Sequence, residues 1–323
     1  MRIGIVTGEF PPMRGGVGAY TSLLARHLAE RHDVHLFSRA GTHSHDGLPV
    51  ENTVTSWNFG SIRAIARWAR ANRLQVINLQ FQTAAFDMSP WVHFLPDLVR
   101  RVPVVTTFHD LRFPYLFPKA GPLRDWIVMH LARTSAGVIV TNYEDEMRVH
   151  HLPRTILIPI ASNILAPLPA NYDANDWRQR TGANPSDLLV GYFGLFNRSK
   201  GIDTLLESIA HLRAGGVPAR LVFIGGGAGS SDPTNATYAT EIAEHIDRLK
   251  LADAVHQTGY LDDEAAVGCF LKACDIVALP FRDGASYRRG SLMAAIRYGC
   301  PVVTTTPHVE IPQRTQHAVR ATR

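Results

Sequence analysis

The sequence is poor in cysteine and contains no long hydrophobic run. Its three cysteines, Cys269, Cys274 and Cys300, lie in the last sixth of the 323 residues. Their spacing matches no zinc-binding pattern, so we expect free buried thiols in a reducing cytoplasm rather than a disulfide scaffold. No run of about 18 apolar residues occurs, which argues against a membrane-spanning helix. The opening MRIGIVTGEF lacks the cleavage site of a signal peptide, and we therefore expect no exported precursor.

The charge of the chain is moderate and unevenly spread. Charged residues make up 19% of the sequence and hydrophobic residues 46%, which excludes an intrinsically disordered chain. The net charge of +5 arises within residues 1–160. It suits either a solvated arginine-rich surface, for example the helix expected around residues 63–73, or peripheral contact with an anionic membrane or acceptor. No nucleic-acid-binding signature accompanies the charge, so we expect no nucleic-acid partner.

Apolar runs and amphipathic helical patterns alternate along most of the chain, which predicts an α/β protein with parallel sheets. We interpret residues 1–160 as one Rossmann-like domain, 161–187 as a proline-rich linker and 188–323 as a second Rossmann-like domain. The second domain looks incomplete, because the tail after residue 306 shows no clear helical or strand period. The predicted strands are 3–8, 34–39, 75–80, 103–108 and 136–142, followed by 188–194, 220–226, 255–260, 275–280 and 301–306.

Two loops that follow strands could approach an anion. The loop over residues 8–18 contains Gly15 and Gly16, and glycines before a helix let backbone N–H groups reach a phosphate. A plain strand-to-helix turn explains this loop equally well. The loop over 193–203 carries Arg198 and Lys200. A cation pair beside a helix N-terminus suits a diphosphate, and two solvated surface cations are the alternative.

A third loop joins a strand to a helix over residues 280–303. Its polar side chains, Asp283, Ser286, Arg289 and Ser291, lie around Gly290. All three loops leave the carboxyl ends of parallel strands, where open α/β sheets bind ligands. Two such domains facing each other would form a cleft with a phosphate site at its floor.

Other common sites lack their signatures. The pairs His43 with His45 and His150 with His151 have no further ligand at metal spacing, so we expect no metal. No G-x-G-x-x-G fingerprint follows a strand, which disfavours an NAD-dependent dehydrogenase.

Several short motifs, in this order and spacing, resemble a retaining glycosyltransferase of family 4, which has the GT-B fold. The resemblance covers about residues 1–306. The matching pieces are E-F-P-P-x-x-G-G-V-G at 9–18, T-F-H-D at 107–110, I-P at 158–159, K-G-I-D at 200–203, G-Y at 259–260, D-I-V-A-L-P at 275–280 and G-C-P-V-V-T at 299–304.

The resemblance implies a nucleotide-sugar donor, held mainly by the second domain, and a glycan, lipid or small-molecule acceptor held by the first. It implies retention of configuration without a metal or cofactor. Gly15 and Gly16 fall where the family's glycine loop approaches the donor phosphates, and Lys200 falls on its diphosphate-binding lysine. His109 falls on the histidine close to the reacting sugar.

The chain departs from the family's pattern at three places. Leu195 stands where an arginine is usual, and Ser286 and Ala294 stand where a pair of glutamates grips the donor. Asp283, with Arg288, Arg289, Gly290 and Ser291, could form a replacement grip. We also interpret the C-terminus as truncated or divergent relative to the family's C-terminal segment. The departures favour, as an alternative, a non-catalytic GT-B domain that binds a nucleotide sugar or a partner. An epimerase or phosphorylase on the same fold fits the motifs less well.

Overall fold

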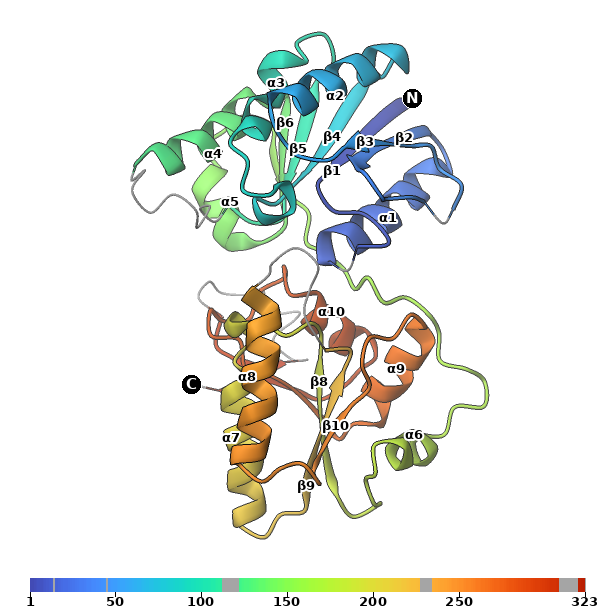
Figure 1. Ribbon diagram of the computed structural model, residues 1–323, viewed down its shortest axis with the longest axis vertical. Coiled ribbons are helices and arrows are strands. Elements are labelled where there is room, and N and C mark those ends of the chain that lie inside the picture. The colour runs from blue at the N-terminus through green and yellow to red at the C-terminus, as the bar shows by residue number, and fades with distance from the viewer. Residues whose placement is uncertain (14, 45, 112–121, 227–233, 308–318, 323) are drawn as a thin grey trace. The chain divides into compact units, whose positions relative to one another are not determined.

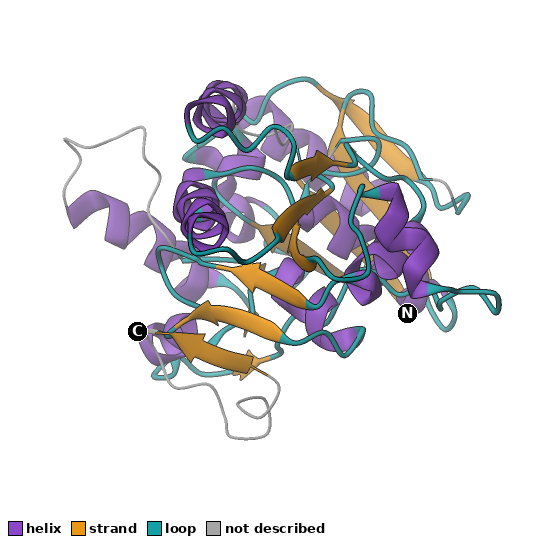
Figure 2. Cartoon of the chain, turned by 90° about the horizontal axis from the view of Figure 1, so that it is seen from below, coloured by secondary structure: helices purple, strands orange, loops and turns teal. Residues whose placement is uncertain are grey.

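The computed structural model describes residues 1–13, 15–44, 46–111, 122–226, 234–307 and 319–322 (Figure 1). The chain divides into two compact units, Met1–Pro159 and Ile160–Arg323. Each unit is a parallel sheet with helices packed on it, and Figure 2 shows the strands in orange and the helices in purple. The predicted α/β class with two Rossmann-like domains is confirmed.

The first unit contains a seven-stranded sheet in the order β3-β2-β1-β4-β5-β6-β7, with every neighbouring pair parallel. Its strands are β1 (Arg2–Thr7), β2 (Asp33–Arg39), β3 (Val50–Val54), β4 (Val76–Phe81), β5 (Val104–Phe108), β6 (Gly137–Val140) and β7 (Thr155–Leu157). Its helices are α1 (Gly16–Ala29), α2 (Phe59–Ala71), α3 (Leu95–Leu98), α4 (Pro122–Thr134) and α5 (Tyr143–Val149), with short 3₁₀ turns η1 (Ala84–Phe86) and η2 (Trp91–Phe94).

Burial explains why this sheet forms. The central strands are covered on both faces, so β1 is an almost continuous apolar run rather than an alternating one. Helix α2 turns one apolar side, including Ile62, Ile65 and Trp68, into the core. Asn58 begins this helix with a capping box, in which its side chain accepts from Ser61 N and Ser61 Oγ accepts from Asn58 N.

The second unit contains a six-stranded sheet in the order β10-β9-β8-β11-β12-β13. Helices α7 and α8 pack together, while α6 and α9 pack together on the other side of the sheet (Figure 1). The strands are β8 (Leu188–Phe193), β9 (Ala219–Ile224), β10 (Val255–Gln257), β11 (Ile276–Leu279), β12 (Val302–Thr305) and β13 (Val319–Thr322). The helices are α6 (Ala174–Arg180), α7 (Ile202–Ala214), α8 (Thr234–Arg248), α9 (Glu264–Ala273) and α10 (Gly290–Arg297), with a 3₁₀ turn η4 (Arg198–Lys200).

The tail, which shows no clear helical or strand period in the sequence, contains a strand that the sequence did not predict. Residues 319–322 form β13, which pairs in parallel with β12 and places Val302 opposite Val319. The pairing uses backbone groups, and four residues are too few to show a period in the sequence. Residues 308–318 and 323, also part of the tail, lie outside the described residues.

Candidate functional site

The loop after β8 holds Lys200 against the backbone of Gly194. Gly194 has φ +123°, and a Cβ there would lie 2.9 Å from Lys200 Nζ. Gly201, the residue before α7, has φ +65°, and its Cβ would lie 2.1 Å from the carbonyl oxygen of Pro280. Both positions therefore require glycine. The close approach at Gly201 fixes the turn that carries Lys200.

Lys200 lies within electrostatic reach of a second cation, Arg289, in this unit. Burial and the positive charge of Arg289 together lower the pKa of Lys200 to about 8. The Arg289 guanidinium lies 4.8 Å from the ring centroid of Phe281, and Arg289 is the N-cap residue that precedes α10. Two cations held together in a partly buried place repel each other, and an anion between them relieves that cost. The arrangement therefore suits an anionic ligand.

Asp283 organises the arginines of the third loop. Its carboxylate forms ion pairs with Arg288, at 3.0 Å, and with Arg289. Because one carboxylate faces two guanidinium groups and Lys200 lies near Arg289, the cluster keeps an excess of positive charge. The observed contacts of Asp283 are thus with arginines that shape the loop.

The predicted serines and Gly290 lie along the same loop and helix start. Ser291 is buried, and its Cβ lies 3.7 Å from the position that a Cβ on Gly194 would take. Gly290 begins α10, and no side chain of the described residues caps the first turn of this helix. Ser286 Oγ is sealed from solvent and has no hydrogen-bond partner within the described part of the chain. Uncapped N–H groups and a spare hydroxyl can bind an anion or a sugar.

Arg198 does not join Lys200. Its guanidinium forms an ion pair with Glu241 of α8 and lies 5.1 Å from the ring centroid of Tyr238. In a 3₁₀ turn each residue advances by about 120°, so side chains two positions apart diverge. The cation that accompanies Lys200 is Arg289 instead. Ala294, where the family's second glutamate would stand, is fully buried.

In the first unit, the glycine loop closes over a buried carboxylate that the sequence analysis missed. Glu9 is only 2% exposed, and its Oε2 accepts a hydrogen bond from Gly18 N at 3.3 Å. A Cβ on Gly15 would lie 1.9 Å from Glu9 Oε1, so Gly15 is required by contact with this side chain. Among the residues that the structure describes, a Cβ on Gly16 would meet nothing within 4 Å. Backbone approach from outside is therefore open at Gly16, whereas Gly15 covers Glu9.

His109 follows β5 and is kept neutral by its surroundings. The side chain is 6% exposed, and its Nε2 lies 2.8 Å from Gln80 Oε1 of β4. The ring of Tyr20 from α1 meets it edge-on, with centroids 5.0 Å apart. Burial lowers the pKa of His109 to about 4, so the imidazole is uncharged at neutral pH. Gln80, fully buried, is a second polar residue that the sequence analysis missed.

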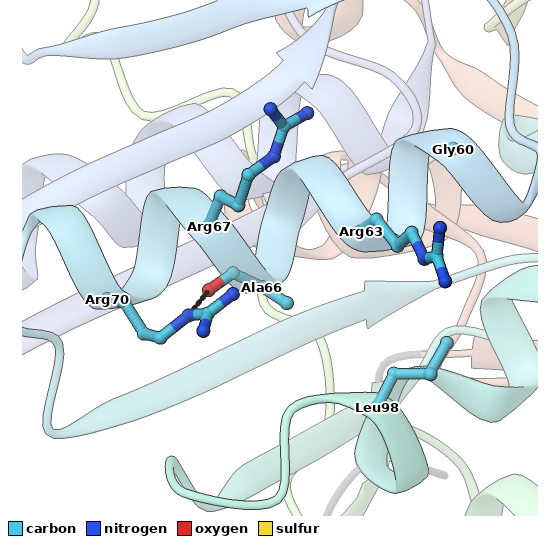
Figure 3. Close-up of a pocket in the computed structure, with 6 residues that line it drawn as sticks. All are labelled: Gly60, Arg63, Ala66, Arg67, Arg70 and Leu98. Carbon is cyan, nitrogen blue, oxygen red and sulfur yellow. Dashed lines mark hydrogen bonds between the residues drawn. The ribbon is translucent and has the colours of Figure 1, made fainter.

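A second feature of the first unit is a basic groove of about 540 Å³ on α2, and His109 does not line it. Arg63, Arg67 and Arg70 of α2 and Leu98 of α3 line this groove, and Figure 3 shows the three arginines projecting from α2. Arg70 Nε donates to Ala66 O at 3.1 Å, and the Arg63 guanidinium lies 4.5 Å from the Phe59 ring centroid. No acidic side chain pairs with these three arginines among the residues that the structure describes.

From the sequence we expect no metal site at the histidine pairs and free, buried thiols at the three cysteines. Across residues 1–307 and 319–322, apart from the short undescribed segments, no group of three or more His, Cys, Asp or Glu could hold a metal ion. His45 lies outside the described residues. The three cysteines are free and buried, as predicted, and burial raises the pKa of each thiol. In the described residues no helix is both long and apolar enough to cross a bilayer.

Comparisons with known proteins divide the chain in the same way. Residues 15–154 match the family described as glycosyl transferase 4-like domain, and residues 187–321 match the family described as glycosyl transferases group 1. The chain belongs to the group 1, GT4-like glycosyltransferases. A search of the curated proteins found no match.

Solved structures share the fold of this glycosyltransferase at low sequence identity. Sucrose-phosphate synthase from Thermosynechococcus elongatus superposes with a TM-score of 0.74 and 18% identity, over 98% of this chain and 84% of that one. Anabaena HepE in complex with UDP-glucose gives 0.71 and 19%, over 95% and 81%. WaaG, a glycosyltransferase of lipopolysaccharide biosynthesis, gives 0.64 and 16%, over 94% and 80%. These similarities identify the GT-B type of fold.

Proposed function

We propose that this glycosyltransferase moves a glycosyl group from a nucleotide-diphosphate sugar to an acceptor, with retention of configuration and without a bound metal. The observation that carries the proposal is a pair of cations in the second unit: Lys200, held beside Gly194, and Arg289, whose positive charge acts on Lys200. A nucleotide diphosphate leaves as an anion, and fixed cations stabilise the negative charge that develops on it. In this way the protein supplies the electrostatic stabilisation that a metal provides in other enzymes.

Each site residue predicted in the second unit has a role in this proposal. Lys200 and Arg289 bind the diphosphate, and the backbone N–H groups of Gly290 and Ser291 add to them at the start of α10. Ser286 Oγ, buried without a partner among the described residues, hydrogen-bonds the donor. Asp283 keeps the two arginines of its loop in place. Arg198, paired with Glu241, shapes the edge of the site.

The first unit supplies His109 and the glycine loop in this proposal. Neutral His109 contacts the reacting sugar through a hydrogen bond, and the Gly15–Gly16 backbone approaches the donor, with Gly16 as the open point. The solved complexes of HepE with UDP and with UDP-glucose support a nucleotide-sugar donor, since that protein shares the fold.

A turnover assay tests the proposed activity. Purified protein is incubated with a panel of UDP-, GDP- and ADP-sugars and with membrane-lipid and oligosaccharide extracts, and release of the nucleotide diphosphate is measured together with the anomer formed. We expect one donor to be consumed with retention by wild-type protein. Lys200→Ala should lose this activity, whereas Lys272→Ala, at an exposed position on α9, should keep it.

The absence of charge at Ser286 and Ala294 favours a second candidate, a domain that binds a nucleotide sugar without transferring it. The two candidates predict the same binding and differ in turnover. More than one product molecule formed per protein molecule would exclude the second candidate. Tight binding with no consumption of any donor would exclude the first.

We further propose that the first unit contacts an anionic membrane surface through the groove on α2. Arg63, Arg67 and Arg70 project from one helix without acidic partners in the described residues, and Trp91 of η2 is 43% exposed beside Phe59. Arginines and an exposed tryptophan are the side chains that suit a lipid headgroup region.

A further inference from the structure

A row of buried and half-buried polar side chains runs from β5 through β4 to His109. Asn78 and Gln80 lie on the same face of β4, two residues apart, and β4 pairs with β5 so that Asn78 lies opposite Val105 and Gln80 opposite Thr107. On this face of β4, the side chain of Asn78 thus reaches the backbone of β5, and the side chain of Gln80 reaches His109, which directly follows β5.

The direction of every hydrogen bond in this row is set by a backbone carbonyl. Asn78 Nδ2 lies 3.2 Å from Val105 O and 3.0 Å from Thr107 Oγ1. A carbonyl oxygen can only accept, so the amide nitrogen of Asn78 must face β5 and its Oδ1 must face Gln80. Gln80 Nε2 then donates to Asn78 Oδ1, which leaves Gln80 Oε1 facing His109.

The same logic decides which nitrogen of His109 carries the proton. Gln80 Oε1 can only accept, and His109 Nε2 lies 2.8 Å from it. Nε2 is therefore the protonated nitrogen of the neutral ring, and Nδ1 carries a lone pair. Nδ1 has no hydrogen-bond partner in the described part of the chain and is not among the polar atoms that are sealed from solvent.

We propose that Asn78 and Gln80 are positioning residues that hold His109 as the Nε2–H tautomer, so that Nδ1 accepts a hydrogen bond from a hydroxyl group of the bound substrate. This inference rests on the proposed function, because it assigns His109 to the reacting sugar. It adds that His109 acts as an acceptor and not as a donor or a cation. The chemical class recognised is a sugar hydroxyl.

The surroundings of the ring agree with this role. The titratable group that faces His109 from the neighbouring α1 is Tyr20, and burial raises the pKa of that phenol, so it is neutral as well. Burial alone lowers the pKa of His109 to about 4. The His109 ring thus stays neutral near pH 7, so Nδ1 keeps the lone pair with which it accepts a hydrogen bond.

The test uses ¹⁵N NMR of histidine-labelled full-length protein, which reports whether each ring nitrogen is protonated. Wild type should show His109 protonated at Nε2 and unprotonated at Nδ1 between pH 5.5 and 8. Gln80→Leu removes the acceptor and leaves a buried N–H without a partner. Because such a group costs about 1–3 kcal/mol, we expect the proton to move to Nδ1 and the rate of transfer to fall by a factor of about 5 to 160.

A second variant, Gln80→Glu, should differ from Gln80→Leu in the ¹⁵N spectrum, because the proton should stay on Nε2 of His109. Gln80→Glu keeps an oxygen facing Nε2, so the Nε2–H tautomer should remain, while the new carboxylate raises the pKa of His109. Gln75→Leu, the same change as Gln80→Leu at an exposed position before β4, is the matched control and should alter neither tautomer nor rate. Circular dichroism shows whether each variant is folded.

The outcomes separate this inference from the proposed function. A wild-type His109 protonated at Nδ1, or a tautomer unchanged in folded Gln80→Leu, would overturn the positioning role. A tautomer that shifts without any loss of transfer would overturn the acceptor role of Nδ1. Failure of the proposed function would appear elsewhere, as an absence of nucleotide-diphosphate binding in a protein whose histidine spectrum is as expected.

Discussion

The two units share one framework and differ in the charge of the side chains that follow their strands. In the first unit, a buried carboxylate, Glu9, and a neutral imidazole, His109, follow β1 and β5. In the second, two cations, Lys200 and Arg289, follow β8 and β11. Both sheets are parallel and buried in the same manner. The difference shows that a few loop side chains, and not the sheet, decide which charge a ligand must have.

Acid should destabilise the first unit more than the second. Burial lowers the pKa of His93 and of His109 to about 4, so between pH 6.5 and 4 the unfolded chain binds more protons and the free energy of unfolding falls as the pH falls. The full shift corresponds to roughly 3 kcal/mol for each histidine. His256 of the second unit is partly exposed, and its effect over the same range should be smaller.

Tryptophan fluorescence can follow the first unit alone. Trp177 is the one tryptophan after residue 160, so in Trp177→Phe the remaining four report on the first unit. Urea unfolding of this variant at pH 6.5 and pH 4 gives the pH effect, and His93→Gln combined with His109→Gln should remove most of it. An equal loss of stability with both histidines replaced would contradict the assignment.

Adjacent glycines in the first loop should respond differently to a methyl group. Gly15→Ala places a Cβ against the Glu9 carboxylate and should lower the free energy of unfolding by about 3 kcal/mol, as in overpacking of a buried site. Gly16→Ala meets open space at the first helical position, so its effect should lie within about 1 kcal/mol of zero. Urea unfolding of both variants measures the difference, and equal effects would show that Glu9 does not constrain the loop.

Binding to anionic vesicles shows whether the arginines of the groove on α2 contribute more to membrane affinity than arginines elsewhere on the protein. Each arginine near an anionic bilayer contributes about 1 kcal/mol, so replacing both Arg63 and Arg67 by Gln should weaken binding to phosphatidylglycerol vesicles by roughly 30-fold at low salt. Arg31→Gln with Arg248→Gln changes the charge equally at exposed positions and is the control. Co-sedimentation that falls equally in both double variants would indicate a net-charge effect without a specific surface.

The cation pair of the second unit should make ligand affinity depend on pH. Free Lys200 loses its proton above pH 8, since its pKa is lowered to about 8, whereas a bound diphosphate holds that proton. The affinity for a nucleotide diphosphate should therefore fall by up to about tenfold per pH unit above pH 8. Titrations at pH 7.5 and 9 measure this fall. Lys200→Ala should bind with the same affinity at both values, and a fall that persists in this variant would assign the proton to another group.

Much of the framework could be predicted from the sequence because its elements have strong periods. Strand β1 is a continuous apolar run, and α1 repeats apolar residues every three or four positions. The edge strands β3 and β7 and the strand β13 were missed, since they are short and β3 and β7 are largely only half-buried. Helix α6 was missed because it lies in a stretch that reads as a linker.

The loops that form the candidate site could be predicted from the sequence, whereas most contacts between their side chains could not. Lys200 and Arg289 lie in two different loops, so nothing in the spacing indicates that Arg289 rather than Arg198 acts on Lys200. Some signals were present. Glu9 is a lone acid before a helix with no acidic residue in its first turn. Asn78 and Gln80 alternate with apolar residues in β4 and so share one face.

Lys200 has its proposed role only if it binds the anionic diphosphate, and calorimetry with UDP, GDP and ADP tests this most directly. One of these nucleotides should bind wild type and Lys272→Ala equally. Lys200→Ala should bind it about 1.5–3 kcal/mol more weakly, the value of a charge-assisted hydrogen bond, which is roughly one to two decades in Kd. An unchanged affinity in Lys200→Ala, or no binding of any nucleotide to folded wild type, would contradict the account.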